Sequence, residues 1–172
     1  MMLSKKLIVL SFLLLVGLTS IAQKKAIEFT KAEDEGWLVD LEEAYILSKD
    51  TNKPILANFT GTDWCGWCKK LRAEVFSRPE FKTWAKENVV LLELDFPRRK
   101  KLPEQQIEPN RGLQQAFQVR GYPTIWLFDL KRPDENERFE IHALGKTGYI
   151  RGGASVFTGE MDKMIAKKVA VN

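Results

Sequence analysis

The chain has two cysteines, Cys65 and Cys68, and their placement constrains the fold more than any other feature. A short, mostly apolar run at residues 55–59 comes just before them and is typical of a strand buried on both faces. From Trp64 onward, apolar residues recur at helical intervals, which predicts a helix that begins at the cysteines. Within one helical turn, two sulfur atoms lie close enough to form a disulfide. The sequence therefore predicts a buried strand, a loop, and a helix that opens on a bridgeable cysteine pair.

The position of each cysteine in that helix predicts its chemistry. Free backbone N–H groups and the positive end of the helix dipole stabilise a thiolate at the start of a helix. We therefore expect Cys65 to have a lowered pKa and to act as the nucleophile. Cys68, one turn further on, is then the thiol that resolves a mixed disulfide. A purely structural disulfide is disfavoured, because a bridge that closes so short a loop adds little stability.

Metal binding is the main alternative for a Cys-x-x-Cys pair. The chain has no second cysteine pair and a single histidine, His142, so it lacks the four nitrogen or sulfur ligands of a closed zinc site. His142 also falls on the polar side of an alternating segment, which disfavours a role as ligand or base. We expect no metal site and no cofactor beyond the cysteine pair. A site shared between two subunits, holding Cu(I) or zinc, remains open.

The first 22 residues have the three-part pattern of a signal peptide. Two lysines without an acid come first, then an apolar stretch too short to span a bilayer, then small residues at Ser20 and Ala22. We expect cleavage after Ala22 and an exported, periplasmic protein that is monomeric and not embedded in the membrane. An uncleaved membrane anchor is the alternative. Without those two lysines the net charge falls from +4 to +2, too small to indicate a nucleic-acid partner.

The rest of the chain alternates strands with helices and ends on two consecutive strands and a helix. This order predicts a single α/β domain over residues 23–172, with a central mixed sheet, flanking helices and one antiparallel strand added at the end. A basic run within residues 96–103 is expected to be a solvated loop, with an acidic partner as the alternative. The expected strands are residues 26–30, 55–59, 89–95, 124–130 and 138–144. The expected helices are residues 37–48, 64–76, 81–88, one from Pro109 that ends before Gly121, and 157–165.

Two stretches of the sequence resemble the thioredoxin superfamily. Residues 59–71 read FTGTDWCGWCKKL, and residues 121–124 read GYPT. The chain is most similar to exported bacterial thioredoxin-like proteins with a WCGWCK active site, and the likeness in element order extends over most of residues 23–172. The resemblance implies a thioredoxin-like fold. It also implies an enzyme, a thiol–disulfide oxidoreductase that exchanges disulfides with protein thiols.

The resemblance further implies roles for residues around the cysteines. Pro123 is implied to follow a cis peptide bond and to pack beside the cysteine pair, where it offers no N–H and no metal-ligating atom. Tyr122 is implied to pair through its backbone with an extended substrate chain. Because Trp64 and Trp67 flank a nucleophile at a helix start, we expect them to form an apolar surface on which substrates dock. Simple packing is the alternative role for the tryptophans. Gly66 and Thr124 are the other expected substrate-binding residues.

Two departures from the family pattern concern the loop and the proton. The loop at residues 61–63 is one residue longer than usual. The buried acid that the family has on the strand before the motif falls at Asn58, and an amide does not serve as the proton acceptor assigned to that acid. Water, Asp63 and Lys69 remain as unranked alternatives for taking the proton of Cys68.

The residues between the cysteines predict the direction of electron flow. Strong oxidants often have a histidine there that supports the first thiolate, whereas this chain has Gly66 and Trp67. We expect a reduction potential nearer the roughly −270 mV of thioredoxin than the roughly −120 mV of a strong oxidant. The protein is then a reductant or isomerase that receives electrons from a membrane donor. The alternatives are a metal-binding module and a non-catalytic interaction domain with a vestigial disulfide.

Overall fold

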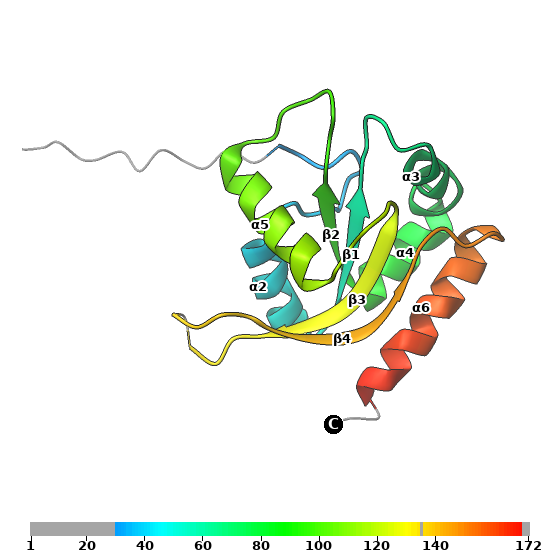
Figure 1. Cartoon of the computed structure of the whole chain (residues 1–172). Helices are drawn as coiled ribbons and strands as arrows, with labels where there is room; N and C mark the ends of the chain where they lie inside the picture. The colour runs from blue at the N-terminus through cyan, green and yellow to red at the C-terminus, as the bar shows by residue number, and fades with distance from the viewer. Residues whose placement is uncertain (1–29, 135, 170–172) are drawn as a thin grey trace, which may run out of the picture.

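The computed structural model describes residues 30–134 and 136–169 (Figure 1). The expected signal peptide and nearly all of the expected strand at residues 26–30 lie outside this part of the chain. The expected α/β class, with a mixed sheet flanked by helices, is confirmed. The elements in order are α2 (Leu41–Thr51), β1 (Ile55–Thr60), α3 (Gly66–Leu71), the π-helix η1 (Arg72–Phe76), α4 (Pro79–Asn88), β2 (Val90–Asp95), α5 (Glu104–Ala116), β3 (Thr124–Lys131), β4 (Glu140–Thr147) and α6 (Gly153–Val169).

The four strands of the sheet lie in the order β2-β1-β3-β4. β1 and β2 are parallel, with Asn58 opposite Glu93 in the register. β3 is antiparallel to β1, and β4 is antiparallel to β3. The sequence predicted that only the last strand would be antiparallel. This was wrong for β3, which is also antiparallel to its neighbour β1. The reason is that residues 117–123 return the chain to the carboxyl end of β1, where Thr124 pairs with Phe59.

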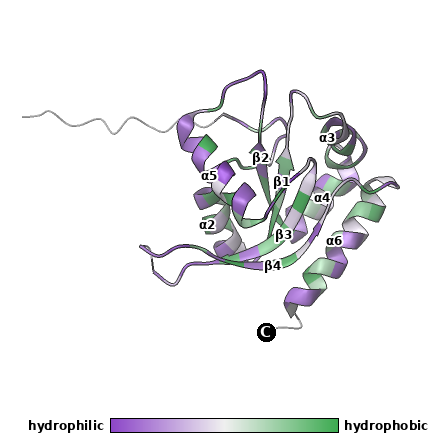
Figure 2. Cartoon of the chain, in the orientation of Figure 1, coloured by the Kyte–Doolittle hydropathy of each residue, from purple (hydrophilic) through white to green (hydrophobic). Residues whose placement is uncertain are grey.

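Helices cover both faces of the sheet, and each face has its own apolar core. α2 and α5 lie on one side, while α3, α4 and α6 lie on the other (Figure 1). Ile55, Ala57 and Phe59 of β1 point into the first core, and Leu56 points into the second, as the alternation of a strand requires. α6 carries hydrophobic and hydrophilic bands in turn, because only one stripe of it faces the sheet (Figure 2).

Local capping sets where two of the helices begin. The helix expected at residues 37–48 begins at Leu41, because the Asp40 side chain accepts a hydrogen bond from the Glu42 N–H at 2.8 Å. The helix expected at residues 64–76 begins at Gly66, since Cys65 is its N-cap. It then widens to a π-helix from Arg72. The cysteines therefore lie at a helix start, as the sequence predicted.

α5 begins at Glu104, five residues before the expected start at Pro109, which lies inside the helix. A proline in a helix interior removes one N–H from the ladder, which is why the sequence favours Pro109 as a first residue. Two buried polar side chains, one before and one after the proline, hold the helix in place. Gln106 accepts a hydrogen bond from the Thr30 N–H, and Asn110 donates to the Asp95 carbonyl, each side chain being 2% exposed. These long-range contacts explain why the helix extends across the proline.

β4 runs from Glu140 to Thr147, later than the expected residues 138–144. The strand continues through Gly145, which sequence reasoning treats as a breaker. A Cβ at that position would lie 2.5 Å from the Sδ atom of Met164 on α6, so close packing of the helix requires a glycine there. A register shift opposite Leu127 and Phe128 accommodates the extra residue.

Candidate redox site

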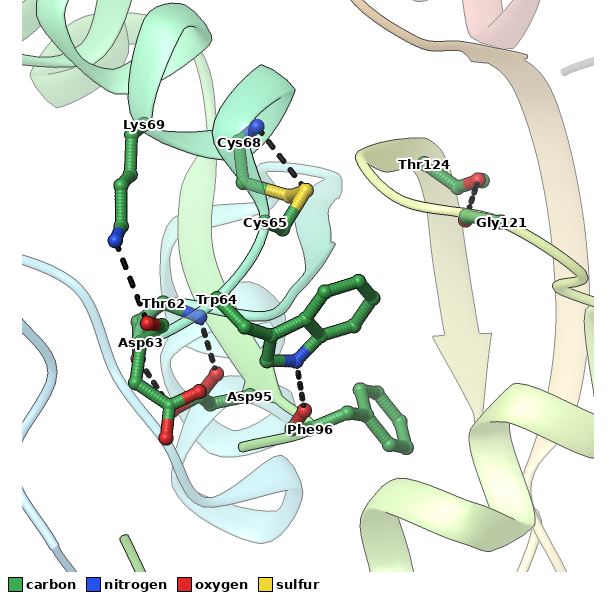
Figure 3. The surroundings of a disulfide bond; sticks show 10 residues. All are labelled: Thr62, Asp63, Trp64, Cys65, Cys68, Lys69, Asp95, Phe96, Gly121 and Thr124. Carbon is green, nitrogen blue, oxygen red and sulfur yellow. Dashed lines mark hydrogen bonds between the residues drawn. A yellow bond between two sulfur atoms is a disulfide. The ribbon is translucent and has the colours of Figure 1, made fainter. Parts of the chain in front are cut away.

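A disulfide joins Cys65 and Cys68 in the first turn of α3, just beyond the carboxyl end of β1 (Figure 3). Cys65 is the N-cap residue, and its Sγ accepts a hydrogen bond from the Cys68 N–H at 3.2 Å. This contact occupies one of the N–H groups that the start of a helix leaves without a partner. In a reduced protein the same N–H group favours a thiolate at Cys65.

Burial does not distinguish the two cysteines. Each is 5% exposed, and their Cα atoms lie 5.3 Å apart. Their positions in the helix differ, because Cys65 precedes α3 whereas Cys68 lies inside it and accepts the Arg72 N–H on its carbonyl. Any difference in thiol reactivity therefore follows from helix position rather than from access. The roles of nucleophile and resolving thiol stay predictions at this point.

Trp64 is fixed against the loops around it. Its indole N–H donates to the Phe96 carbonyl at 2.9 Å (Figure 3). The Arg98 guanidinium lies 3.7 Å from its ring centroid. A Cβ at Gly61 would lie 2.4 Å from the indole nitrogen, so only glycine lets the ring come this close. These contacts give Trp64 a packing role beside the cysteines, and its implied role in substrate binding stays a prediction.

Asp63 connects the basic loop at residues 96–103 to the loop at residues 61–65, which carries Cys65 and is called the redox loop below. Its carboxylate accepts hydrogen bonds from the backbone N–H groups of Arg98, Arg99 and Lys100, at 2.7–3.2 Å. Desolvation acts to raise the pKa of Asp63, but these N–H groups and the Lys100 charge outweigh it and lower the pKa to about 2. Lys69 donates to the Asp63 carbonyl at 3.4 Å. The expected loop at residues 96–103 is thus a loop, and its backbone is tied down beside the cysteines.

Trp67 is the exposed aromatic residue of the motif, with 59% of its surface accessible. Its ring centroid lies 5.2 Å from that of Tyr149, in the segment before α6. The Tyr149 hydroxyl donates to Glu74 at 2.5 Å, and Glu74 also pairs with Lys70 at 2.5 Å. Hydrogen bonding to Glu74 raises the pKa of Lys70. The charge of Lys70 is therefore directed toward Glu74. Trp67 packs at the surface against Tyr149, whose position the Glu74 hydrogen bond fixes.

The loop that carries Pro123 packs against Trp64 through Tyr122. The Tyr122–Pro123 peptide bond is cis, as the resemblance implied. The Tyr122 ring packs edge-on against Trp64, with 5.7 Å between centroids, and its hydroxyl accepts a hydrogen bond from Gln114 at 2.5 Å. Thr124 donates through its hydroxyl to the Gly121 carbonyl at 2.8 Å (Figure 3). The structure thus places the Pro123 loop near the motif, and substrate contacts there stay a prediction.

Two neighbouring surfaces bear on substrate and metal binding. A groove of about 980 Å³ runs beside the Pro123 loop and is lined in part by Pro123, Thr124, Trp126 and Lys146. Within residues 30–134 and 136–169, no group of three or more His, Cys, Asp or Glu side chains is arranged to hold a metal ion. The side chain of His142 is 51% exposed and lies 3.7 Å from Glu140.

A layer of buried polar residues lies below the redox loop, and sequence reasoning missed it. Asp95 accepts hydrogen bonds from both the N–H and the hydroxyl of Thr62, at 2.9 and 2.7 Å, and pairs with Lys100 at 3.0 Å. Glu93 is 7% exposed on the same face of β2, and burial followed by the nearby Asp95 charge raises its pKa to about 7. The alternation of leucine with these two acids at residues 92–95 was the signal, but it is also typical of a half-exposed strand.

Comparison with known proteins places the chain in a family. A family model for a thioredoxin-like domain matches residues 41–140. The chain belongs to this thioredoxin-like family. It is a homologue of the disulfide bond reductase DsbH of Chlamydia pneumoniae, with 32% identity over 119 residues, and it carries the Cys-x-x-Cys redox pair of an enzyme of this type. It is also similar to the thioredoxin-related protein DsbJ of the same organism, with 29% identity over 164 residues.

Solved structures support the same fold for this thioredoxin-like chain. A DsbH oxidoreductase structure matches with a TM-score of 0.66 and 27% identity, covering 84% of this chain and 96% of that one. A thioredoxin from Thermus thermophilus shares the fold, with a TM-score of 0.52 and 18% identity. The thioredoxin-like fold predicted from the sequence is therefore confirmed.

The match to the relatives is partial in length. The similar region covers 69% of this chain and 66% of DsbH, and 95% of this chain but 46% of DsbJ. In the described part of this thioredoxin-like chain, none of the helices combines the length and apolarity needed to cross a bilayer.

Proposed function

We propose that the chain is an exported thiol–disulfide oxidoreductase that reduces or isomerises disulfides in proteins through Cys65 and Cys68. The observation that carries this proposal is the position of Cys65 as N-cap of α3, with its sulfur on the Cys68 N–H. Kinship with a disulfide bond reductase supports the activity. The signal-peptide pattern of residues 1–22 supports export to the periplasm.

The two cysteines carry both electrons of the exchange. The Cys65 thiolate attacks one sulfur of a client disulfide, which breaks the client S–S bond and releases one client thiolate. Cys68 loses its proton and attacks the Cys65 sulfur, which re-forms the Cys65–Cys68 disulfide and releases the second client thiolate. The protein gives up two electrons and the client gains them. A membrane electron donor then reduces the pair for the next cycle, and the protein acts as a monomer.

The surroundings of Cys65 favour the reducing direction. A strong oxidant needs a highly stabilised thiolate, and the helix N–H groups are the main stabilising groups placed at Cys65. The nearest lysines are engaged elsewhere, since Lys69 bonds the Asp63 carbonyl and Lys70 bonds Glu74. Trp67 points its ring toward Tyr149 rather than supplying a donor to the sulfur. We therefore infer a midpoint potential nearer roughly −270 mV than roughly −120 mV.

A redox titration against glutathione or dithiothreitol tests the direction. A midpoint well below about −200 mV supports a reductant or isomerase, and a midpoint above about −160 mV means that the protein introduces disulfides. A Cys68→Ser variant identifies the client proteins, because it retains Cys65 and accumulates mixed disulfides with them in cells. A Cys65→Ser variant is the matched control and should capture none of them. Recovery of the same proteins with both variants would contradict the proposal.

A further inference from the structure

Asn58 occupies the position on β1 where an acid would serve the redox pair. It is 6% exposed, and its Oδ1 atom has no hydrogen-bond partner within the described residues. A buried carbonyl oxygen without a hydrogen-bond donor lowers the stability of the fold, so a neighbouring group that can donate a hydrogen bond is expected beside it. An amide cannot itself take the proton that Cys68 releases.

The loop residues near the motif do not fill that role. The Asp63 carboxylate is held by backbone N–H groups, and its pKa of about 2 makes it a poor base at neutral pH. Lys69 is a donor to the Asp63 carbonyl, and an ammonium group has no site to accept a proton. The acceptor therefore has to be sought below the loop, in the sheet.

Glu93 is the buried acid nearest to Asn58 in the register of the sheet. The two residues are direct partners in the parallel β1–β2 pair, so their side chains lie on the same face about 4.8 Å apart at the backbone. That face is the one on which Leu56 meets α3, η1 and α4, because β1 alternates. Glu93 is 7% exposed and has no lysine or arginine ion pair within 4 Å in the described chain.

The helix above the sheet links Glu93 to Cys68. Arg72 lies four residues after Cys68, and its N–H donates to the Cys68 carbonyl, so the two residues share one side of the helix. The Arg72 guanidinium interacts electrostatically with Glu93 and bonds Asp34 at 2.7 Å. Glu93 and Cys68 therefore face the same layer between the sheet and the redox helix.

The charges around Glu93 keep it near the midpoint of its titration at neutral pH. Burial raises the pKa of Glu93 most, and the negative charge of Asp95 and, more weakly, that of Glu33 raise it further. The Glu33 backbone N–H and the Lys100 charge oppose them, and Arg72 adds a positive charge from η1. With a pKa of about 7, the carboxyl group can both accept and return a proton.

We propose that Glu93 accepts the proton of Cys68 during disulfide exchange, on the strand next to the position where Asn58 has replaced the acid. This inference rests on the proposed function. In the mixed disulfide between Cys65 and a client, the Cys68 thiol gives its proton to the Glu93 carboxylate. The Cys68 thiolate forms the bond to the Cys65 sulfur, and the bond from Cys65 to the client breaks. The neutral Glu93 returns its proton to the Cys68 sulfur when the pair is next reduced, so that Cys68 is again a thiol and Glu93 again a carboxylate.

A small aromatic disulfide separates the two steps of exchange. Reduced protein is mixed with 5,5′-dithiobis(2-nitrobenzoate), and thionitrobenzoate release is followed by stopped flow between pH 5 and 9. The first release reports attack by Cys65, and the second reports attack by Cys68 on the mixed disulfide. We expect the second step of the unaltered protein to rise with pH through an inflection near 7.

The Glu93→Gln variant should slow the second step alone. At pH 7 we expect a loss of at least about tenfold, with the inflection moved up toward the ordinary thiol pKa near 8.5. The first release should keep its rate. Asn58→Asp added to Glu93→Gln should restore most of the rate, because it puts an acid back on β1. The matched control is Asp129→Asn, a carboxyl-to-amide change on β3 where Lys168 pairs with Asp129 at 2.9 Å, and it should change neither step.

Two outcomes overturn the proposal in different ways. An unchanged pH profile of the second step in Glu93→Gln removes Glu93 as the acceptor and leaves the oxidoreductase function intact. Unaltered protein that shows no second release fails the proposed function itself. If the variant does not fold, carbon-13 NMR of Glu93 in the unaltered chain decides the matter. Its titration should shift between the reduced and disulfide forms, and identical titration in both forms rules the proton transfer out.

Discussion

On the sheet face toward α3 and α4, the two halves of the β1–β2 strand pair are both buried but differ in their chemistry. In the amino-terminal half, Ile55, Leu56 and Ala57 are 0% exposed and pack into the apolar cores on both faces of the sheet. In the carboxyl-terminal half, Asn58 and Glu93 are 6% and 7% exposed, yet one has an unpartnered oxygen and the other a carboxyl group. The redox loop begins where the polar half ends.

This contrast separates what holds the fold from what equips the site. Burial of apolar side chains stabilises the fold, whereas burial of a carboxyl group without a close cation costs stability. The carboxyl-terminal half is therefore a place where the protein gives up stability beneath its cysteines. Substitutions at Leu56 and at Glu93 should therefore change the free energy of unfolding in opposite directions, and the following changes test this.

The largest expected effect is a loss of stability in the apolar half. Leu56→Ala should lower the free energy of unfolding by about 2–5 kcal/mol, because it leaves a cavity in the core below α4 and α6. Urea unfolding measures the loss. The matched control is Leu47→Ala on α2, where the side chain is 43% exposed and the change should stay within about 0.5 kcal/mol. Similar losses of unfolding free energy in Leu56→Ala and Leu47→Ala would contradict the account of the apolar core.

The next effect should have the opposite sign. Burial raises the pKa of Glu93 from 4.5 to about 7, so the folded protein binds more protons than the unfolded chain between these values. Its stability then falls as pH rises from 4.5 through 7. Glu93→Gln removes this cost. The gain in the free energy of unfolding, variant minus unaltered protein, should be roughly 3 kcal/mol larger at pH 8 than at pH 4. Urea unfolding at both pH values measures it, and a gain that does not depend on pH would contradict the account.

Asp63→Asn is expected to lower the stability of the folded protein by a smaller amount. The pKa of Asp63 is lowered to about 2, so its stabilising contribution is present above about pH 4 and disappears as pH falls through 2. The variant should unfold at a lower temperature than the unaltered protein at pH 6, and this difference should shrink as pH falls and vanish below pH 2. Amide hydrogen exchange at Arg99 and Lys100 should speed up at pH 6, because their N–H groups lose the carboxylate. Exchange that does not change would mean that Asp63 does not hold the loop.

The smallest effect on stability is expected at Trp67, with its effect confined to large substrates. Its side chain is 59% exposed, so Trp67→Ala should change the unfolding midpoint very little. It should lower kcat/KM for insulin reduction by about fivefold, since exposed aromatic residues often supply contact energy to protein partners. The rate with oxidised dithiothreitol should stay constant. Ile46→Ala on α2, 52% exposed, is the control, and equal losses with both disulfides would assign Trp67 to the chemistry instead.

The redox site and most of the fold could be predicted because their signals are local. The apolar run of β1, the helical spacing after it and the positions of Cys65 and Cys68 all lie within about twenty residues. Trp67 as a surface residue follows from the same stretch. Periodicity and capping act over such distances, so the sequence alone carries them.

The missed features depend on contacts between distant parts of the chain. Glu93 is buried only because β2 pairs with β1 in one register and the segment around Glu33 covers it. The early start of α5 depends on Gln106 binding Thr30, which is 76 residues away. The Asp63 contacts with the basic loop likewise join residues 35–37 positions apart. Neither periodicity nor composition reports such contacts.

Alkylation of the reduced protein tests the central claim most directly, which is that Cys65 is the attacking thiol because it lies at the start of α3. The rates of iodoacetamide reaction are measured between pH 5 and 9, and the modified cysteine is identified by mass spectrometry. We expect Cys65 to react first, with an apparent pKa below the ordinary value of about 8.5, and Cys68 to react far more slowly. Both cysteines are equally buried in the disulfide form, so the difference would come from the helix start. Faster modification of Cys68 would contradict the account.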